Sequence, residues 1–394
     1  MGKINIAVIG LGARGSGNLK TILKFSEIEV TAVCDLYKDR CEKAVQTVRE
    51  LGFKTPFSTV DYTQIIGRRD VDAFLIFTSW ESHIKIAADA MRAGYAVGLE
   101  VGGAQNLDEC FELVKAQREK NAPFMLLENC CFGKHEMLVR NMAFDGIFGD
   151  VVHCHGAYAH DLREEICTGR EKRHYRLKHY IENNCENYPT HELGPIAKIL
   201  NINNGNKMLK LVSVASKAAG LERYIKDRSD SIVNKDLIGQ KFRQGDIVNT
   251  IITCAGGETI SLRLDTSLPR SYSRELTVHG TKALYEENTY TVFMDGDAED
   301  FNTQNFYKCT FGNAERFESK YLPDCWKKVN DAIISSGHGG MDYFTFEAFF
   351  NALLNGEAMP IDVYDAASWM AVSCLSKKSI LAGGMAIDIP DFKM

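Results

Sequence analysis

The chain has 394 residues, of which 45% are hydrophobic and 25% charged, and its formal net charge is −6 at pH 7. This composition is that of an ordinary globular protein and excludes a disordered chain, while the length is sufficient for two domains. The negative charge disfavours a nucleic-acid partner, because phosphate binding needs a basic surface. No run of about 18 apolar residues occurs, so the sequence predicts neither a membrane span nor a membrane partner.

The start of the chain and its cysteines bear on location. The first predicted strand begins at Ile4, which leaves no room for a signal peptide or a twin-arginine leader. We therefore expect a cytoplasmic location for the chain as given, although a leader removed before this start would leave no trace. The twelve cysteines show no repeated spacing, which fits a reduced compartment better than a disulfide framework.

The first motif along the chain is a glycine-rich turn. The apolar run Ile4 to Ile9 predicts a strand, and it leads into Gly10-Leu11-Gly12-Ala13-Arg14-Gly15 and a predicted helix. Strand, turn and helix in this order form a dinucleotide-binding fingerprint. Gly10 would permit the turn, Gly12 would let the backbone approach a pyrophosphate, and Gly15 would let the helix pack closely on the strand. The alternative, a glycine-rich turn without a ligand, is disfavoured by these flanking elements.

The second predicted strand ends in an acidic residue. Val30 to Cys34 is strand-like, and Asp35 follows it directly. About 20 residues after the last glycine, such a carboxylate accepts hydrogen bonds from the adenosine ribose hydroxyls. It would also repel a 2′-phosphate, so the sequence predicts NAD as the cofactor rather than NADP.

Strand-like and helical segments continue to alternate up to about residue 130. The further strand-like runs are Ala73 to Phe77, Ala96 to Leu99 and Phe124 to Leu127, and the helical runs include Tyr37 to Leu51 and His83 to Ala93. This rhythm predicts a Rossmann-type, doubly wound parallel sheet. Ligands bind beyond the carboxyl ends of such strands, so we inspect the residues that follow them. They include Trp80, Glu81, His83, Glu100, Val101, Glu128 and Asn129.

Trp80 and His83 lie where an adenine, ribose or nicotinamide edge can be held. For the tryptophan, a packing lid without cofactor contact is the alternative.

A different pattern follows Gly149 and Asp150. Long strand-like stretches lie at Val151 to Tyr158, Leu211 to Ala215, Ile247 to Thr253, Thr259 to Leu264 and Arg274 to His279. They predict an antiparallel sheet with one covered face. Two late amphipathic patterns, Tyr343 to Leu354 and Ala366 to Leu381, predict helices that pack on the rest of the structure. We therefore expect an α/β protein with an NAD-binding Rossmann domain at 1–130 and a C-terminal α+β domain at 131–394, with a large, mostly antiparallel sheet, for substrate binding and oligomerisation.

One cluster resembles a metal site. In His153-Cys154-His155, strand alternation sends the two histidines to one face and the cysteine to the other. Two histidines are too few for a site. We therefore predict no metal and interpret the cluster as sheet surface.

The segment Arg176 to Pro195 is the most unusual of the second domain. It contains Tyr188-Pro189-Thr190-His191, and the pair Gly194-Pro195 predicts a helix start before the apolar run Ile196 to Leu200. Tyr188 and His191 would then be presented from a stiff turn, which suits acid-base groups. A helix cap and a packing ring are the alternative roles for these two residues.

These motifs resemble glycoside hydrolase family 109, the NAD-dependent α-N-acetylgalactosaminidases of the Gfo/Idh/MocA oxidoreductase superfamily, over nearly the whole chain. The matching elements are the glycine-rich turn, Trp80-Glu81-Ser82-His83, Glu100-Val101, Glu128-Asn129, Tyr158 with Asp161-Leu162-Arg163, Arg176, Tyr188-Pro189-Thr190-His191, Pro269 to Arg274 and Gly337 to Asp342. The glycine fingerprint belongs to the entire superfamily, whereas Tyr-Pro-Thr-His and Glu-Val are more specific.

The resemblance implies two sets of site residues. NAD would be bound by Gly10, Leu11, Gly12, Arg14, Gly15, Asp35, Trp80, Glu81, His83, Glu100, Val101 and Asn129. The sugar would be bound by Glu128, Tyr158, Arg176, Tyr188, Pro189, Thr190, His191, Tyr272 and His338.

Several positions depart from related patterns. Where this chain has Glu100-Val101-Gly102, the dehydrogenases of the superfamily have a sequence that looks like Glu-Lys-Pro, and its lysine is catalytic. The catalytic histidine of their second signature corresponds to Ile196 of this chain. Within family 109, Gly102 stands where proline is common and Glu192 where glycine is common. These departures make a simple dehydrogenase less favoured and leave the sugar specificity open.

The reaction implied by the resemblance is hydrolysis through transient oxidation. Hydride leaves C3 of the glycoside for NAD⁺, the C2 proton is removed, the aglycone leaves C1, water adds, and hydride returns to C3. His191, assisted by Tyr188, would handle the C3 hydroxyl proton, Tyr158 would act at C2 or on the leaving group, and Arg176 would clamp hydroxyls or an N-acyl oxygen. An NAD-dependent sugar dehydrogenase and a non-catalytic nucleotide-sensing module are the alternatives. We also expect a homo-oligomer.

Overall fold

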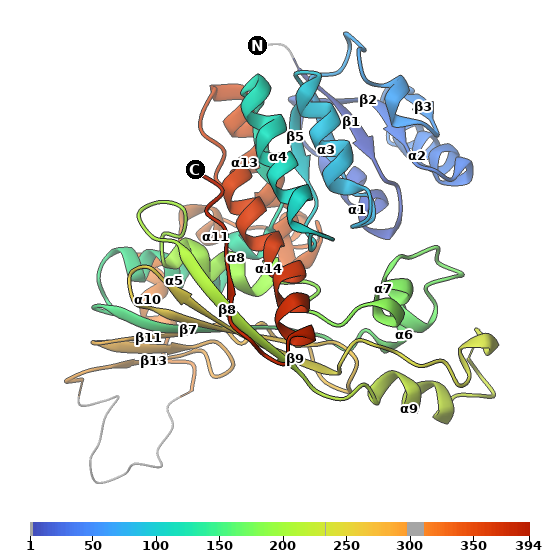
Figure 1. The fold of residues 1–394 in the computed structure, drawn as a ribbon. Coiled ribbons are helices and arrows are strands. Elements are labelled where there is room, and N and C mark those ends of the chain that lie inside the picture. Colours follow the sequence, from blue (N-terminus) through green and yellow to red (C-terminus); the bar gives the residue numbers. More distant parts are fainter. Residues whose placement is uncertain (1–2, 233, 298–310) are drawn as a thin grey trace. The chain divides into compact units, whose positions relative to one another are not determined.

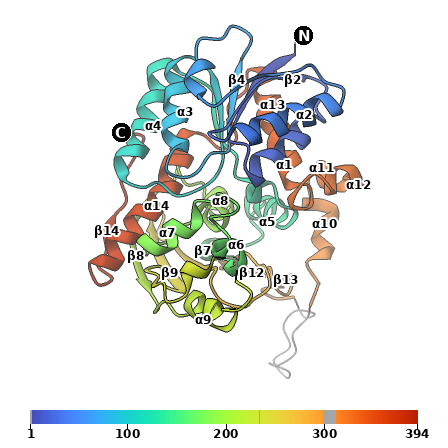
Figure 2. The same ribbon diagram turned by 90° about the vertical axis from the view of Figure 1, so that its right-hand side faces the viewer.

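A computed structural model describes residues 3–232, 234–297 and 311–394 (Figure 1). The chain forms two compact units: unit 1 is 1–129 with 329–368, and unit 2 is 130–328 with 369–394. The predicted domains, 1–130 and 131–394, differ from these units in the placement of 329–368. This segment joins unit 1 because its main helix packs on the first helix of the chain (Figure 2). Just beyond the end of that first helix, the ring of Phe25 stacks 4.6 Å from the ring of Tyr343.

Unit 1 is built on a six-stranded parallel sheet, ordered β3-β2-β1-β4-β5-β6. Its strands are β1 (Ile4–Ile9), β2 (Ile28–Cys34), β3 (Phe57–Thr59), β4 (Ala73–Ile76), β5 (Ala96–Leu99) and β6 (Phe124–Leu126). Its helices are α1 (Ala13–Ile22), α2 (Lys38–Glu50), α3 (His83–Arg92), α4 (Leu107–Lys120), α12 (Asp331–Ile334) and α13 (Met341–Asn355), with 3₁₀ turns at Tyr62–Gln64 and His338–Gly340. β4, β5 and β6 are fully buried, as expected for a parallel sheet covered on both faces.

The predicted doubly wound sheet is confirmed. Chain order reverses at β1, which lies between β2 and β4, and this switch point is where doubly wound sheets bind ligands. The residues singled out after β1, β2, β4, β5 and β6 therefore share one edge of the sheet.

Unit 2 is built on an eight-stranded sheet, ordered β13-β12-β11-β7-β10-β9-β8-β14. Its strands are β7 (Val151–Ala159), β8 (Met208–Ala215), β9 (Ile247–Cys254), β10 (Thr259–Asp265), β11 (Thr277–Gly280), β12 (Ala283–Glu286), β13 (Thr291–Met294) and β14 (Ile387–Asp388). Its helices are α5 (Lys134–Phe144), α6 (Arg163–Cys167), α7 (Arg176–Glu182), α8 (Thr190–Ile199), α9 (Gly220–Asp227), α10 (Glu315–Tyr321) and α11 (Asp324–Lys327), with 3₁₀ turns at Asn129–Phe132 and Lys235–Leu237. The last helix, α14 (Val363–Leu381), has residues in both units.

The second sheet is mostly antiparallel, as predicted, with β7 and β10 as a parallel pair. Alternate residues of β9 are buried and exposed, which indicates one covered face. The alternation expected for the histidine pair is confirmed, because Cys154 is fully buried while His153 and His155 are half-buried on the other face.

The helix start predicted at Gly194-Pro195 is wrong. α8 begins at Thr190, directly after Pro189, and Pro195 lies inside it. Pro195 has no amide hydrogen to donate to the carbonyl of His191, and an interior proline costs about 3 kcal/mol. Nearly every residue of α8 is buried, so packing offsets this cost. None of the helices in the described residues is long and apolar enough to cross a membrane.

Candidate active site

The glycine-rich turn has the geometry that its sequence predicted. Gly10 has a φ of +89°, and a Cβ there would lie 2.6 Å from the backbone of Phe77. A Cβ at Gly15 would lie 1.8 Å from the carbonyl oxygen of Gly10, so the close packing of α1 requires glycine. At Gly12 the nearest atom to such a Cβ is an Arg40 nitrogen at 3.5 Å, which leaves the backbone open to a ligand. The N-terminus of α1 has no side-chain cap, as in helices that bind a pyrophosphate.

Asp35 is hydrogen-bonded to the backbone of this turn. Its carboxylate accepts hydrogen bonds from the amides of Leu11, at 2.7 Å, and Tyr37, at 2.9 Å. Arg40 lies 3.6 Å from the same carboxylate. Each carboxylate oxygen has two lone pairs, so these bonds leave capacity for ribose hydroxyls.

Arg14 is held by carboxylates of the same unit. Its guanidinium forms two hydrogen bonds to Asp342, at 2.6 and 2.9 Å, and a third to Glu100 at 3.0 Å. His338 Nδ1 lies 2.9 Å from Asp342, whose second oxygen accepts a bond from Asn129 at 2.6 Å. The structure thus joins His338, predicted for the sugar pocket, to three residues predicted for the cofactor.

Two shifted pKa values belong to this cluster. Burial raises the pKa of Glu100, against the opposing charge of Arg14. Burial alone would also raise the pKa of Asp342, but the hydrogen bond from His338 and the charge of Arg14 hold it well below its usual range. Asp342 is therefore an anion at neutral pH, and Arg14 is its cation.

The residues after β4 and β5 pack on each other. A Cβ at Gly102 would lie 2.3 Å from Trp80 Cδ1 and 3.0 Å from His83 Cε1, so the ring of Trp80 occupies space that only glycine leaves open. Burial lowers the pKa of His83 to about 4, which makes this imidazole neutral at pH 7. Trp80, His83 and Val101 are buried, whereas Glu81 is exposed. Glu128, two residues after β6, is the last residue of this set and has a buried carboxylate.

Unit 2 brings three predicted catalytic residues together. The ring of Tyr158, on β7, lies 4.6 Å from that of Tyr188 and 5.4 Å from that of His191. The rings of Tyr188 and His191 are 4.7 Å apart. All three side chains are buried, so they form one compact acid-base cluster.

Arg176, at the start of α7, supplies the positive charge of this cluster. Its guanidinium carbon lies 4.9 Å from the Tyr188 ring, and its Nε lies 2.9 Å from Glu165 Oε1. Burial raises the pKa of Tyr158 to about 12, although the charge of Arg176 and a hydrogen bond with it act in the opposite direction. Tyr158 is therefore a protonated phenol at neutral pH.

The remaining predicted sugar residues lie in the same unit. Tyr272 is partly exposed, and its ring lies 5.3 Å from that of His160, which in turn lies 6.2 Å from Tyr158. Pro189 is the N-cap of α8. Thr190 is fully buried, and its hydroxyl has no hydrogen-bond partner among the described residues, so a ligand or water can satisfy it.

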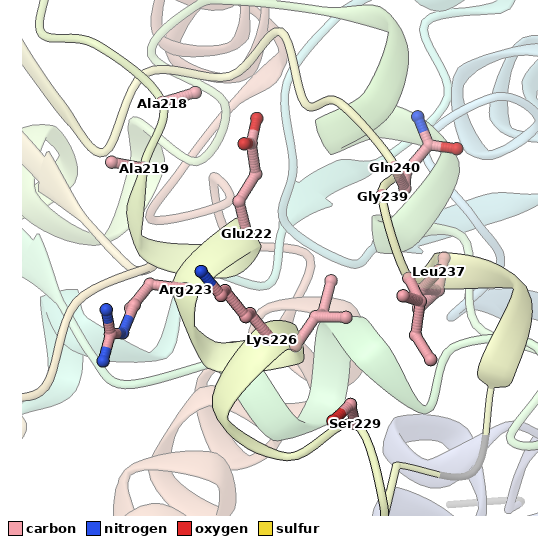
Figure 3. A pocket seen from close by; sticks show the side chains of 11 residues that line it. Ala218, Ala219, Glu222, Arg223, Lys226, Ser229, Leu237, Gly239 and Gln240 are labelled. Atoms are coloured by element: carbon pink, nitrogen blue, oxygen red, sulfur yellow. The ribbon is translucent and has the colours of Figure 1, made fainter.

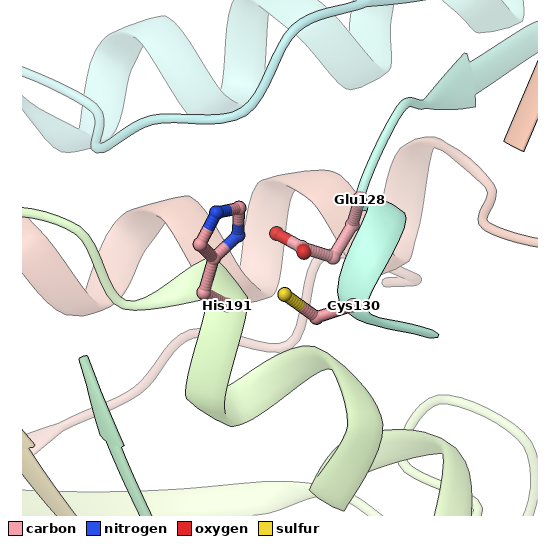
Figure 4. Close-up of side chains that lie close together, drawn as sticks. All are labelled: Glu128, Cys130 and His191. Carbon is pink, nitrogen blue, oxygen red and sulfur yellow. The ribbon is translucent and has the colours of Figure 1, made fainter. Parts of the chain in front are cut away.

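Two neighbours of the cluster were missed by the sequence analysis. The Cys130 sulfur and a His191 ring nitrogen lie within 4.8 Å of each other (Figure 4). Two such groups do not make a metal site, and nothing in a lone cysteine signals this contact. His160 could have been found, because it lies two residues after Tyr158 and strand alternation carries both to one face.

A further pocket of unit 2 contains none of the predicted site residues. It has a volume of about 620 Å³ and lies between α9 and the segment 237–240 (Figure 3). Its lining combines apolar side chains with Glu222, Arg223 and Lys226.

Residues 132–394 match the family model described as the glycosyl hydrolase 109 C-terminal domain, and 4–127 match that of an oxidoreductase family NAD-binding Rossmann fold. A glycosyl hydrolase family 109 protein of Stenotrophomonas maltophilia is 34% identical over 413 residues, covering 99% of this chain and 89% of the relative. The chain belongs to glycoside hydrolase family 109.

A second relative agrees with this assignment, and a solved structure shows the same fold. The family 109 chain is 31% identical to a Tannerella forsythia protein named alpha-N-acetylgalactosaminidase, over 99% of this chain and 86% of that one. A levoglucosan dehydrogenase solved with NADH and levoglucosan has a TM-score of 0.74 at 18% identity, covering 98% of this chain and 100% of that one, and shows the shared fold. As a family 109 member with an NAD-binding domain, the chain is a glycoside hydrolase with NAD as its cofactor.

Proposed function

We propose that this chain is an α-N-acetylgalactosaminidase that cleaves its glycoside through oxidation at C3, elimination across C1 and C2, addition of water, and reduction at C3. The observation that supports it most is the buried cluster of Tyr158, Tyr188 and His191 beside Arg176. Such a cluster offers proton donors and acceptors without the catalytic lysine of a dehydrogenase. The name of the Tannerella forsythia relative supports the choice of sugar.

The nucleotide edge of unit 1 fits NAD. The open backbone at Gly12, the uncapped N-terminus of α1 and the Asp35 carboxylate suit a pyrophosphate and an adenosine ribose. NAD, when bound, supplies reversible hydride acceptance, so that it ends each turnover as it began.

His191 and Tyr188 act on the C3 hydroxyl in this proposal. The hydroxyl loses its proton when C3 is oxidised and regains it when C3 is reduced. A histidine can take and return a proton near neutral pH. The ring contact of 4.7 Å between Tyr188 and His191 holds the imidazole in a fixed place.

Tyr158 acts as a proton donor to the leaving group. With a pKa of about 12, its phenol retains its proton at neutral pH and is a poor base. When the bond between C1 and the glycosidic oxygen breaks, that oxygen gains an electron pair and needs a proton. Arg176 positions the sugar through hydroxyls or the N-acyl oxygen, and its charge stabilises the phenolate left behind.

The test is a screen of aryl α- and β-glycosides, with and without an N-acetyl group, without added cofactor. We expect release of the phenol from the α-N-acetylgalactosaminide, with no build-up of NADH. In deuterated water, the product should carry deuterium at C2, because that C–H bond must break. Steady accumulation of NADH would favour a sugar dehydrogenase instead, and absence of turnover despite bound NAD would favour a nucleotide-sensing module.

A further inference from the structure

A buried arginine holds the hydroxyl of Tyr272, a residue expected to bind the sugar. Nη1 of Arg274 donates a hydrogen bond to the phenol oxygen at 3.2 Å, and the guanidinium carbon lies 5.8 Å from the centre of the Tyr272 ring. An arginine cannot accept a hydrogen bond, so the hydrogen of the phenol itself is directed away from Arg274. Tyr272 is 44% exposed, so this hydrogen can be donated to a ligand.

We propose that Arg274 is a positioning residue of the sugar site, which fixes the Tyr272 phenol so that its hydroxyl hydrogen is donated to an oxygen of the sugar. This inference deepens the proposed function and rests on the sugar-binding role expected for Tyr272. Arg274 acts through Tyr272 and does not itself contact the sugar.

Two carboxylates anchor the guanidinium of Arg274. Its Nε forms an ion pair with Oε1 of Glu136, on α5, and its Nη2 lies 3.7 Å from Oε1 of Glu287. The side chains of Arg274 and Glu136 are 11% and 2% exposed. A Cβ at Gly133 would lie 2.0 Å from Oε2 of Glu136, so this carboxylate is packed against the backbone before α5. Because Nε and Nη2 face the two acids, Nη1 is the nitrogen that meets Tyr272.

The backbone places Tyr272 close to the acid-base cluster. Ser273, the next residue, forms an antiparallel bridge with Ala159 at the end of β7. Residues opposite each other in such a pair share one face, so Tyr272 lies beside His160, with ring centres 5.3 Å apart. The ring of His160 in turn lies 6.2 Å from that of Tyr158, the proposed proton donor. A hydroxyl fixed at Tyr272 is therefore two ring contacts from the proposed site of bond cleavage.

The experiment compares Tyr272→Phe, Arg274→Lys and the double variant in the NAD-loaded protein. Lysine keeps the charge beside Glu136, but its ammonium group lacks the planar fork that meets Glu136 and Tyr272 together. We expect each single variant to raise the KM of the best aryl glycoside about 5- to 10-fold, the effect of one hydrogen bond, with kcat changed less. Because Arg274 acts through the phenol, the double variant should exceed Tyr272→Phe by less than about 2-fold.

Arg223→Lys is the control, because Arg223 is an exposed arginine of α9 that pairs with Asp227. It should leave KM unchanged. If the two single effects on KM multiply in the double variant, Arg274 serves the fold rather than Tyr272, and the proposal is overturned. An unchanged KM in Arg274→Lys would overturn it as well.

A second variant and a spectrum protect the test against an Arg274→Lys protein that does not fold. Glu136→Gln weakens the anchor of Arg274 while Glu287 still faces the cation. In protein labelled with ¹³C at the tyrosine ζ carbons, the Tyr272 signal is the one that Tyr272→Phe removes. This signal should shift in Glu136→Gln without any sugar, and it should shift in the parent when N-acetylgalactosamine is added.

The absence of either shift would overturn the proposal. If no glycoside is cleaved, the proposed function fails, while the two shifts of the Tyr272 signal still decide the role of Arg274.

Discussion

His191 is buried in the first turn of α8, within ring contact of Tyr158 and Tyr188. If it moves the C3 hydroxyl proton, His191→Ala should lower kcat by about 100-fold or more, the usual range for a general base. The variant must keep bound NAD and the parental Tm, which separates lost chemistry from lost folding. Cys154→Ser is the control, because this thiol lies on the face of β7 opposite to its neighbours His153 and His155 and has no assigned role in the reaction. A folded, NAD-loaded variant with near-parental kcat would contradict the assignment.

Tyr158 gives a second prediction at this scale. A protonated phenol that assists departure of the aglycone matters most when the leaving group is a poor one. Tyr158→Phe should therefore lose more kcat/KM with alkyl than with nitrophenyl glycosides. An equal loss across a series of leaving groups would point instead to a role in binding or at C2.

Asp35 carries the prediction for the cofactor. Asp35→Ala should weaken NAD binding and narrow the preference for NAD over NADP, because it removes the ribose acceptor and frees Arg40, now 3.6 Å from that carboxylate, to meet a 2′-phosphate. Titration of both nucleotides by fluorescence measures this. Glu42→Ala, an exposed acid on α2, serves as control. An undiminished preference for NAD would show that other groups set it.

Among the elements, the loop after β5 packs closely against the ring of Trp80 at Gly102. In Gly102→Ala the new methyl group would overlap the Trp80 ring, and overpacking of this kind typically costs about 1–3 kcal/mol. We expect a lower Tm and weaker NAD binding. Gly17→Ala is the control, because nothing lies within 4 Å of a Cβ there and alanine favours its helix. Equal behaviour of the two variants would mean that the Trp80 ring moves freely.

Most strands of both sheets were predictable, because each is a short apolar or alternating run bounded by turn residues. β3, β12, β13 and β14 were missed, because runs of two to four residues show little alternation. The start of α8 was not predictable, because Gly194-Pro195 has the local signal of a helix start and only burial of the surrounding residues overrides it. The amphipathic pattern also predicted the helix α13, but it did not show that this helix packs on α1. The ion pair between Arg14 and Asp342 joins residues 328 positions apart, and no local pattern reports such a separation.

For the whole molecule, the proposed reaction requires a cofactor that need not leave. The purified protein should therefore carry NAD, released into the supernatant on denaturation and measured by its absorbance after enzymatic reduction. Asp35→Ala protein, treated in parallel, should release less. Absence of nicotinamide, together with no affinity for added NAD, would contradict this prediction.

The expected homo-oligomer stays a prediction. The second sheet presents Val152, Val214 and Ile251 to solvent, each more than half exposed. Light scattering coupled to size exclusion would give the subunit number. An Ile251→Lys variant of unchanged mass would show that this face is not the interface.

The return of 329–368 to unit 1 has a consequence for biosynthesis. The rings of Phe25 and Phe77 are met by Tyr343 and Phe346 of α13, which leave the ribosome after most of unit 2. The nucleotide-binding unit therefore cannot complete its folding, and part of its apolar surface stays exposed to solvent, until translation is nearly complete. For the same reason, a fusion protein that contains only the residues up to about 130 would carry an incomplete nucleotide-binding unit. A fusion protein that also contains 329–368 would include the segment that covers its apolar surface.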